Sequence, residues 1–501
     1  MELTAQRVST ISATVCIALI VTALVLVGTA TASGEGLLIF WLALGGVVGF
    51  MIYAIKGDLL IAICAWMVTL AVFHEEFWRM TMPFFFSITI PRLGLLILVL
   101  LYVAMLALGR FRLRPSWPIS GIFLAVLLYF FLSALISGFQ TRSIVSVHYR
   151  LIGGYLFPFA AFVLVLHAFW HEGDFRRLGC FFAIVSIYLT FIGWCEQFKL
   201  YALVWPRFIS DPTVGIHWGR VRGPFVSSAA MGLALVYCYF SNLVLARNRV
   251  QFRWVLYTIN AGMLPVILWT KTRSVWVAFV LCSLIWAAYS RRRISRIVLV
   301  SLFLALVLLV SVLNMGNFLS ADRSRGGLAD TGPILLRVGL AQMTWEIVKA
   351  HPFFGLGFGH FRDFAPGFAR DPSSPYYAFG TTALEHNNVL SIAAETGVVG
   401  LGFYLTLVVF LIWSSVRLYR RLPASSTCVI SRDTIVLYWI LAAAYLIDGT
   451  FRETSDNPFA NCLFFGLSAV PVALDYLLSP VPLNVNARIR SIGSCQLCVD
   501  S

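Results

Sequence analysis

The stretch EHNNVLSIAAETGVVGL, residues 385 to 401, places an imidazole and two amides directly before an apolar run. His386 is a candidate contact for the polar head of a lipid, and its imidazole, with an unperturbed pKa of about 6.5, changes charge close to neutral pH. Asn387 is a candidate cap for the helix that the apolar run predicts. The N-terminus of that helix adds a partial positive charge that suits an anionic group.

Two glycines follow in the same run. Around a helix that starts at His386, Gly397 and Gly400 lie at about 20° and about 40° from the histidine, and Glu395 lies on the opposite face. We therefore expect a slot without side chains below the imidazole. Such a slot admits either a neighbouring helix or a polyprenyl or acyl chain.

Two arginines stand beside apolar runs, on the same side of the expected membrane as His386. Arg222 belongs to GRVRGPF and Arg273 to TKTRSVW. Their partners are either intramembrane acids, such as Glu395 and Asp448, or a phosphate or pyrophosphate group, which a planar guanidinium binds with two hydrogen bonds. Three further cations are candidates to line the same cavity: Arg220, Lys271 and Arg337.

We find no motif for a metal or another cofactor. The chain has no Asp-x-Asp pair of the kind that holds a divalent cation and no His-Glu-x-x-His. Its 10 cysteines are scattered, and Cys495 and Cys498 form a single CxxC without a second pair to complete a zinc site. We expect no metal and no cofactor.

The elements that position these residues must be membrane helices. Of 501 residues, 60% are hydrophobic and 12% charged, which excludes a soluble domain. Apolar runs of about 17 to 22 residues, long enough to cross a bilayer, recur along the chain. We predict an all-α polytopic membrane protein with about 12 to 14 transmembrane helices. The runs begin near residues 11, 37, 59, 93, 118, 151, 178, 226, 253, 274, 297, 398, 434 and 458, and we expect the first to be an uncleaved helix rather than a signal peptide.

The net charge of +15 is concentrated in four arginine clusters, within 110–114, 247–253, 291–296 and 417–421. With a cytoplasmic N-terminus, all four fall in cytoplasmic loops, so the positive-inside rule explains most of the excess. Membrane lipid is therefore an expected partner, and nucleic acid is not. The same topology puts His386 on the outer side of the membrane and the C-terminus in the cytoplasm.

The outer segments divide the chain. Residues 1–210 are expected to form N-terminal transmembrane helices, 211–420 a catalytic region with a large outer loop at 315–385, and 421–501 C-terminal helices and a cytoplasmic tail. Within the loop, residues 333–352 have the spacing of an amphipathic helix. The following HPFFGLGFGHF alternates glycine with aromatic residues, which favours an irregular connector.

These motifs together resemble a known family. His386-Asn387, followed by nine residues, Gly397, two residues and Gly400, fits the H-[NSQ]-x9-G-x-x-G pattern of the O-antigen ligase and polymerase superfamily. RVRGPF, TKTRSVW and HPFFGLGFGHF precede it in the order that this family shows, over residues 219 to 401. After RVRGPF the family often has an Asn-containing stretch, where this chain has Val-Ser-Ser-Ala at 226–229.

The resemblance implies a metal-independent membrane glycosyltransferase of the bacterial inner membrane, with its active site facing the periplasm. Its donor would be a glycan on undecaprenyl pyrophosphate, held by Arg222 and Arg273. His386 would activate or orient the acceptor hydroxyl. O-antigen ligase, with lipid A core as acceptor, is the leading expectation for this function in surface polysaccharide biosynthesis.

Other functions stay open. A polymerase of surface polysaccharide and a protein O-oligosaccharyltransferase would use the same kind of donor. A transporter of lipid-linked glycans would also need outer arginines, but it should show charged or broken helices accessible from both sides. The candidate polar residues gather on the outer side, which favours an enzyme.

Overall fold

The computed structural model describes residues 59–74, 77–80, 88–107, 118–140, 147–169, 172–247, 252–289, 332–368, 387–422, 431–452, 454 and 457–478. The chain divides into two compact units, Met1–Leu113 and Arg114–Ser501. The apolar runs expected near residues 11, 37 and 297 lie outside the described residues, as do His386 and the CxxC pair. The domain boundaries expected at 210 and 420 stay predictions.

The described residues of the first unit form two helices and a pair of short strands. Helix α3 (Leu59–Val72) packs against α4 (Ile90–Ala107). The indole of Trp66 donates to the Pro91 carbonyl, 3.0 Å away. Between the helices, β1 (Arg79–Met80) and β2 (Ile88–Thr89) form an antiparallel pair. These two-residue strands are the small exception to the predicted all-α class.

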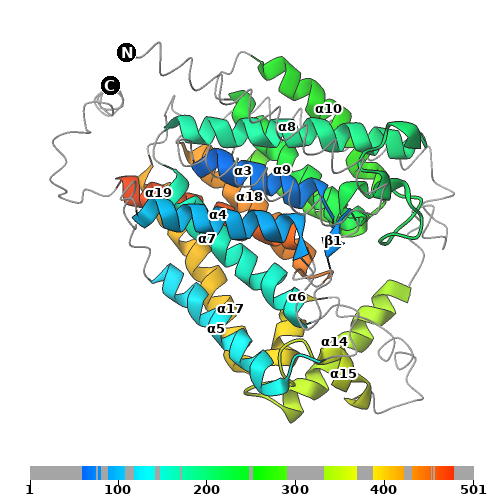
Figure 1. Cartoon of the computed structure of the whole chain (residues 1–501), viewed down its shortest axis with the longest axis vertical. Helices are drawn as coiled ribbons and strands as arrows, with labels where there is room; N and C mark the ends of the chain where they lie inside the picture. Colours follow the sequence, from blue (N-terminus) through cyan, green and yellow to red (C-terminus); the bar gives the residue numbers. More distant parts are fainter. Residues whose placement is uncertain are drawn as a thin grey trace. The chain divides into compact units, whose positions relative to one another are not determined.

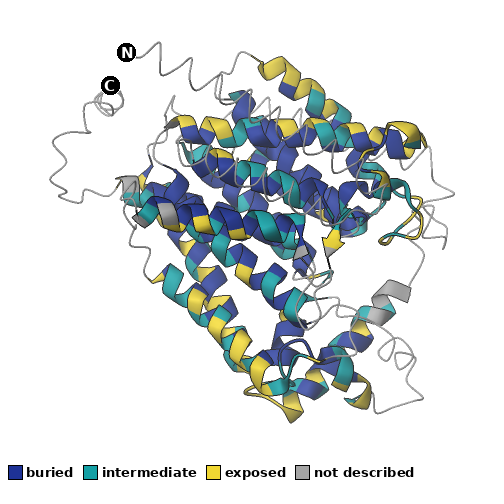
Figure 2. Cartoon of the chain, viewed as in Figure 1, coloured by how far each residue is buried: buried dark blue, intermediate teal, exposed yellow. Residues whose placement is uncertain are grey.

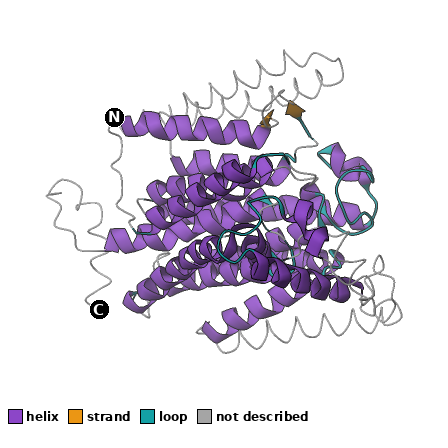
Figure 3. Cartoon of the chain, turned by 90° about the horizontal axis from the view of Figure 1, so that it is seen from below, coloured by secondary structure: helices purple, strands orange, loops and turns teal. Residues whose placement is uncertain are grey.

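Helices make up the described part of the second unit almost entirely (Figures 1 and 3). Its α-helices are α5 (Ile119–Ser137), α6 (Val147–Leu151), α7 (Phe157–Ala168), α8 (Glu172–Gln197), α9 (Ser228–Arg247), α10 (Arg253–Trp269), α11 (Arg273–Tyr289), α14 (Gly332–Ala350), α15 (Phe361–Phe364), α17 (Asn388–Arg421), α18 (Arg432–Gly449) and α19 (Pro458–Leu478). A π-helical turn, Ile152–Leu156, joins α6 to α7, and 3-10 turns occupy Tyr201–Leu203, Arg207–Ser210, Gly223–Phe225 and Ala365–Phe368.

Six helices among the described residues are long and apolar enough to cross a membrane. They are Ile119–Ser137, Val147–Ala168, Gly173–Gln197, Ser228–Arg247, Asn388–Arg421 and Pro458–Tyr476, and shorter apolar helices occur at Leu59–Val72, Ile90–Val103 and Arg273–Tyr289. The predicted all-α polytopic membrane class is confirmed. The amphipathic helix expected at 333–352 is α14.

Helix α9 lies at the centre of the second unit. Almost every residue along it is buried, against α8, α10, α11 and α18 (Figure 2). Polar side chains join these helices: Asn242 donates to Ser186 and Asn260, and Asn260 donates to the Tyr239 carbonyl, each over 3.0 Å. In contrast, α5 exposes a row of large apolar side chains, including Leu128 and Leu135. Such a face suits contact with lipid tails.

Candidate functional site

The first turn of α17 is fixed by Asn387, as the sequence predicts. The Asn387 backbone is extended, and its Oδ1 accepts hydrogen bonds from the Val389 and Leu390 amides, both at 3.0 Å. Its Nδ2 donates to the carbonyl of Thr450, just after α18, over 3.3 Å. Three hydrogen bonds therefore anchor the residue that directly follows His386.

Helix α17 is broken at Gly397, where φ is 66° and ψ is −170°. The connector at residues 352–361 lies against this break. Its Leu356 and Gly357 amides donate to the carbonyls of Ala394 and Glu395, over 2.9 and 2.8 Å. In return, the amides of Val398 and Val399 donate to the carbonyls of Pro352 and Phe353, over 2.8 and 3.4 Å. The connector thus satisfies backbone groups on both sides of the break.

The break corrects the straight-helix projection. The helix begins at Asn388, and beyond Gly397 its direction is reset, so a single projection from His386 does not reach Gly400. A Cβ on Gly397 would collide with the carbonyl of Phe353, and one on Gly400 would meet Thr396 and, at 2.7 Å, the ring of Tyr129 on α5. The predicted slot is therefore filled by the connector and by a neighbouring helix.

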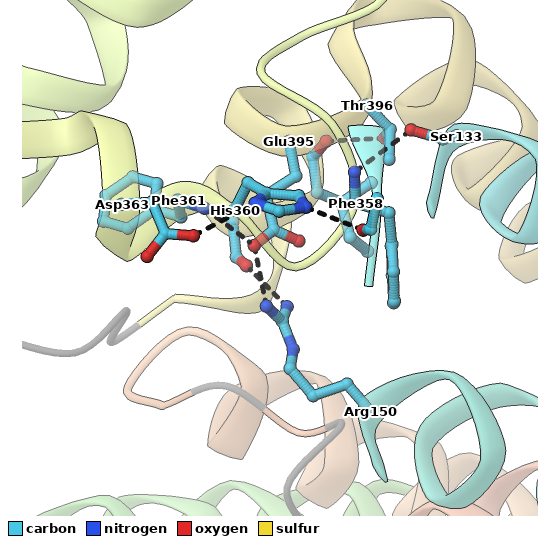
Figure 4. Close-up of polar contacts among 11 residues, drawn as sticks. Ser133, Arg150, Phe358, His360, Phe361, Asp363, Glu395 and Thr396 are labelled. Atoms are coloured by element: carbon cyan, nitrogen blue, oxygen red, sulfur yellow. Dashed lines mark hydrogen bonds and ion pairs between the residues drawn. The ribbon is translucent and has the colours of Figure 1, made fainter. Parts of the chain in front are cut away.

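Glu395 forms a buried ion pair that the sequence analysis missed (Figure 4). Its Oε1 lies 2.7 Å from Nη1 of Arg150 on α6, and the two side chains are only 1% and 5% exposed. Arg150 also donates to Ser391 Oγ over 3.2 Å, and the Phe361 amide donates to Glu395 Oε1 over 3.3 Å. Because Arg150 opens an apolar run, its charge was the available signal, but nothing in the sequence indicates its partner.

The end of the connector is held on α5 (Figure 4). His360 Nδ1 lies 3.0 Å from Asp363 Oδ2, and its Nε2 lies 2.9 Å from the Gly138 carbonyl. The amide of Phe358 donates to Ser133 Oγ over 3.1 Å. Together with the ion pair, these contacts tie the first half of α17 to α5, α6 and the connector.

A cavity of about 280 Å³ adjoins the start of α17. It lies among α14, α15, the first turn of α17 and the residue after α18, and its lining is Arg337, Val338, Leu340, Ala341, Thr344, Phe361, Asn387, Leu390, Ser391 and Thr450. Arg337, expected to face a substrate cavity, is on its wall, and its guanidinium lies 5.0 Å from the centre of the Phe451 ring.

Three other predicted cations come together where RVRGPF meets TKTRSVW. Arg220 donates to the carbonyl of Lys271 over 3.3 Å, and Arg273 is the first residue of α11. Ser228 Oγ lies 2.9 Å from both His217 Nδ1 and Thr272 Oγ1, which links the two segments. All three cations are half-buried. We call Arg220, Lys271 and Arg273 the cation cluster.

Arg222 is placed differently. Its side chain is fully buried, and its guanidinium donates to the carbonyls of Ile209, Asp211 and Val214 and stacks 4.5 Å from the Trp218 ring. Burial lowers the pKa of this guanidinium, and the charge of Glu196 opposes the shift. The structure therefore uses Arg222 to hold the loop at 209–218.

The acids expected as partners of the outer arginines are engaged elsewhere. Glu395 pairs with Arg150, and Asp448 pairs with Arg452 one helical turn along the chain. Arg222 instead lies beside Glu196 of α8, whose Oε2 accepts the amides of Arg222 and Gly223 over 3.2 and 2.7 Å. These pairings correct the expectation: Glu395 meets a cation from a helix far away in the sequence, and Asp448 meets one only four residues along the chain.

The cation cluster and the start of α17 lie at the same end of the helices. Cys282, near the middle of α11, donates to the carbonyl of Ile440, near the middle of α18. Arg247, the last residue of α9, contacts both Trp286, near the end of α11, and Asp433, near the start of α18. The two helices are therefore antiparallel, and Arg273 is level with the end of α18. Asn387 is bonded to Thr450 at that same end.

Comparison with known families identifies the region that contains this arrangement. Residues 258–405 match a family model described as O-antigen ligase. This part of the chain is similar to O-antigen ligases. The match confirms the resemblance to the superfamily and runs from α10 to α17, so it includes TKTRSVW, α14, the connector and the His386 motif. RVRGPF lies outside it. No curated protein matches the chain.

Proposed function

We propose that this protein transfers a glycan from undecaprenyl pyrophosphate to an acceptor hydroxyl, at the periplasmic face of the bacterial inner membrane. The supporting observation is that the cation cluster and the first turn of α17 lie at one end of the bundle. A leaving pyrophosphate needs cations, and the attacking hydroxyl needs a base. Lipid A core is the proposed acceptor, which makes the protein a ligase.

In the proposed reaction, the oxygen of the acceptor hydroxyl attacks the sugar carbon that is bonded to the pyrophosphate. The new carbon–oxygen bond forms as the bond to the pyrophosphate breaks. His386 takes the hydroxyl proton, and undecaprenyl pyrophosphate leaves with its negative charge held by Arg220, Lys271 and Arg273. The chemistry requires no metal.

Arg222 has an indirect role in this proposal. Its guanidinium is buried against three carbonyls, so we assign it to the shape of the loop that precedes the cation cluster. Gly397 and Gly400 likewise act through packing, because protein atoms fill the space in front of both. In this proposal the pyrophosphate is therefore bound by the half-buried cation cluster.

The break in α17 bears on the transport alternative. Broken helices line substrate paths in many transporters. Here the carbonyls of Ala394 and Glu395 and the amides of Val398 and Val399 are bonded to the connector. A break that is closed in this way favours a fixed catalytic scaffold over a moving gate.

The test is a transfer assay in proteoliposomes that contain a chelator and undecaprenyl-pyrophosphate glycan, with either lipid A core or a second repeat unit as acceptor. Product on the core indicates a ligase, and growth on the repeat unit indicates a polymerase. His386→Ala should lower the rate about 10²- to 10⁴-fold, the usual contribution of a general base. His351→Ala removes an exposed imidazole of the same outer segment and is the matched control.

Two results would contradict the proposal. Full activity of folded His386→Ala protein would remove the base. Absence of product with both acceptors in the wild type would favour one of the alternative functions, protein glycosylation or transport.

A further inference from the structure

The cavity beside α14 is lined by both apolar and polar groups. Val338, Leu340, Ala341, Phe361 and Leu390 supply apolar surface. Hydroxyl, amide and guanidinium groups come from Thr344, Ser391, Thr450, Asn387 and Arg337. A sugar ring has the matching character, with apolar C–H faces and hydroxyl groups around its edge. Ligand sites commonly combine an apolar lining with a few placed polar groups.

The polar residues of the wall differ in what they still offer a ligand. Asn387 is committed, since its Oδ1 accepts two backbone amides and its Nδ2 donates to Thr450. Ser391 accepts a hydrogen bond from Arg150, so its hydroxyl keeps a proton to donate. Thr344 supplies a second hydroxyl from α14. Thr450 donates its hydroxyl proton to the Ile447 carbonyl over 2.7 Å. Asn387 and Thr450 are therefore structural parts of the wall, and the hydroxyls of Ser391 and Thr344 are the recognition groups.

Charge separates this cavity from the cation cluster. Among the described residues that line the cavity, Arg337 is the one cation, and it lies over the Phe451 ring. The cation cluster has three positive charges within two facing turns. A pyrophosphate suits the cluster, and a neutral sugar suits the cavity.

The volume and position of the cavity complete the argument. About 280 Å³ is close to the lower end of ligand cavities, which begin at roughly 300 Å³, and it accommodates a sugar ring rather than a whole lipid-linked glycan. Asn387 lines the cavity, and the proposed base, His386, directly precedes it in the sequence. A hydroxyl held there starts close to the proposed base, which is the geometry that favours reaction.

We infer that this cavity binds one sugar ring of the acceptor, with Thr344 and Ser391 as hydrogen-bonding residues and Phe361 and Leu390 against its apolar face. This inference rests on the proposed function for the identity of the ligand. The sugar belongs either to a core oligosaccharide or to a repeat-unit glycan, since both present hydroxyls on a ring.

The test measures binding rather than transfer. Wild-type protein in nanodiscs is titrated separately with lipid-free core oligosaccharide, lipid-free repeat-unit glycan and undecaprenyl-pyrophosphate glycan. Ala341→Trp fills the cavity from α14, and Gln342→Trp adds the same bulk at the neighbouring exposed residue, which does not line it. Thr344→Val removes one hydroxyl with little change of shape, and Thr344→Ser keeps it.

We expect one of the two lipid-free glycans to bind. Ala341→Trp should weaken that binding by at least about tenfold, which corresponds to about 1.4 kcal/mol, and should change binding of the lipid-linked glycan less than about twofold. Thr344→Val should weaken it roughly twofold to tenfold, the range for one hydrogen bond, with recovery in Thr344→Ser. Gln342→Trp should match the wild type.

Other binding results overturn the inference. Absence of binding by both lipid-free glycans, or equal affinity in wild type, Ala341→Trp and Thr344→Val, would show that the cavity is not an acceptor site. Weaker binding of only the lipid-linked glycan would assign the cavity to the donor. If the binding results are as expected but no glycan is transferred, the proposed function fails and the sugar site stands.

Discussion

Replacement of Gly397 by alanine tests the central structural feature, the break in α17. Gly397 has φ of 66°, and an added Cβ would strike the backbone carbonyl of Phe353. A carbonyl cannot move aside as a flexible side chain does. The connector would have to retreat, and the hydrogen bonds from Val398 to Pro352 and from Val399 to Phe353 would open.

The expected cost has two parts. Holding an alanine at φ of 66° and ψ of −170°, a combination that essentially only glycine adopts, costs about 1–3 kcal/mol. Loss of two backbone hydrogen bonds adds about 1 kcal/mol each on a net basis, and more if the freed groups stay buried. We therefore expect Gly397→Ala to lower the free energy of unfolding by about 3–5 kcal/mol.

Gly402 provides the matched control in the same helix. It lies in the regular part of α17, and a Cβ there would meet open space. Gly402→Ala should be neutral or stabilise by about 0.5–1 kcal/mol, since alanine favours a helix more than glycine does. The assay is unfolding in mixed micelles by titration with sodium dodecyl sulfate, with the transfer rate measured on the same samples.

Equal stability of the Gly397→Ala and Gly402→Ala proteins would refute the reasoning. It would mean that α17 runs straight and that the connector does not enter the helix. Loss of transfer in Gly397→Ala without loss of stability would contradict it as well, since the glycine would then act on the substrate rather than on the fold.

Three further predictions concern the residues around this break. Arg150→Met should destabilise the protein by about 3–5 kcal/mol, because it leaves the Glu395 carboxylate buried without its cation. Addition of Glu395→Leu should restore most of that stability in the same unfolding assay. Equal loss of stability in the single and the double variant would show that the two residues are not coupled. Asn387→Ala should cost about 1 kcal/mol and slow transfer, whereas Asn387→Ser should keep the cap, and identical rates for the two would contradict a positioning role. In Arg222→Lys the ammonium group lacks the planar, multiple N–H groups with which the guanidinium reaches three carbonyls. Amide hydrogen exchange of residues 209–218 should therefore accelerate, and unchanged protection would refute the assignment of Arg222 to this loop.

Helix positions were largely predictable because apolar length and flanking charge are local signals. The runs expected near residues 253 and 458 begin where α10 and α19 begin. The amphipathic spacing at 333–352 predicted α14, and the Ser/Asn preference of helix caps predicted Asn387. Each of these features depends on residues within one or two turns of each other.

The contacts within the site were not predictable, because they join residues that are far apart in the sequence. Arg150 and Glu395 are 245 residues apart, and Tyr129, which donates to the Thr396 carbonyl, is 267 residues from its partner. Gly397 was read as a helix residue, because a single sequence does not distinguish a glycine that packs against a helix from one that breaks it. The glycines of HPFFGLGFGHF were the relevant signal: Gly355, Gly357 and Gly359 all have positive φ and bring the connector backbone close to its neighbours.

The spacing between His386 and Gly397 now has a physical explanation. The residues between Asn387 and Gly397 form a short half-helix, Asn388–Thr396, capped by Asn387 and stopped by the break. Arg150 holds its middle through Ser391 and its end through Glu395. Each residue added or removed would turn the capped end by about 100° relative to the fixed break and move it about 1.5 Å along the axis. The number of residues before the first glycine therefore sets the direction in which the chain enters the half-helix at Asn387, and this length, rather than a shared helix face, explains why the spacing between the histidine and the glycine matters.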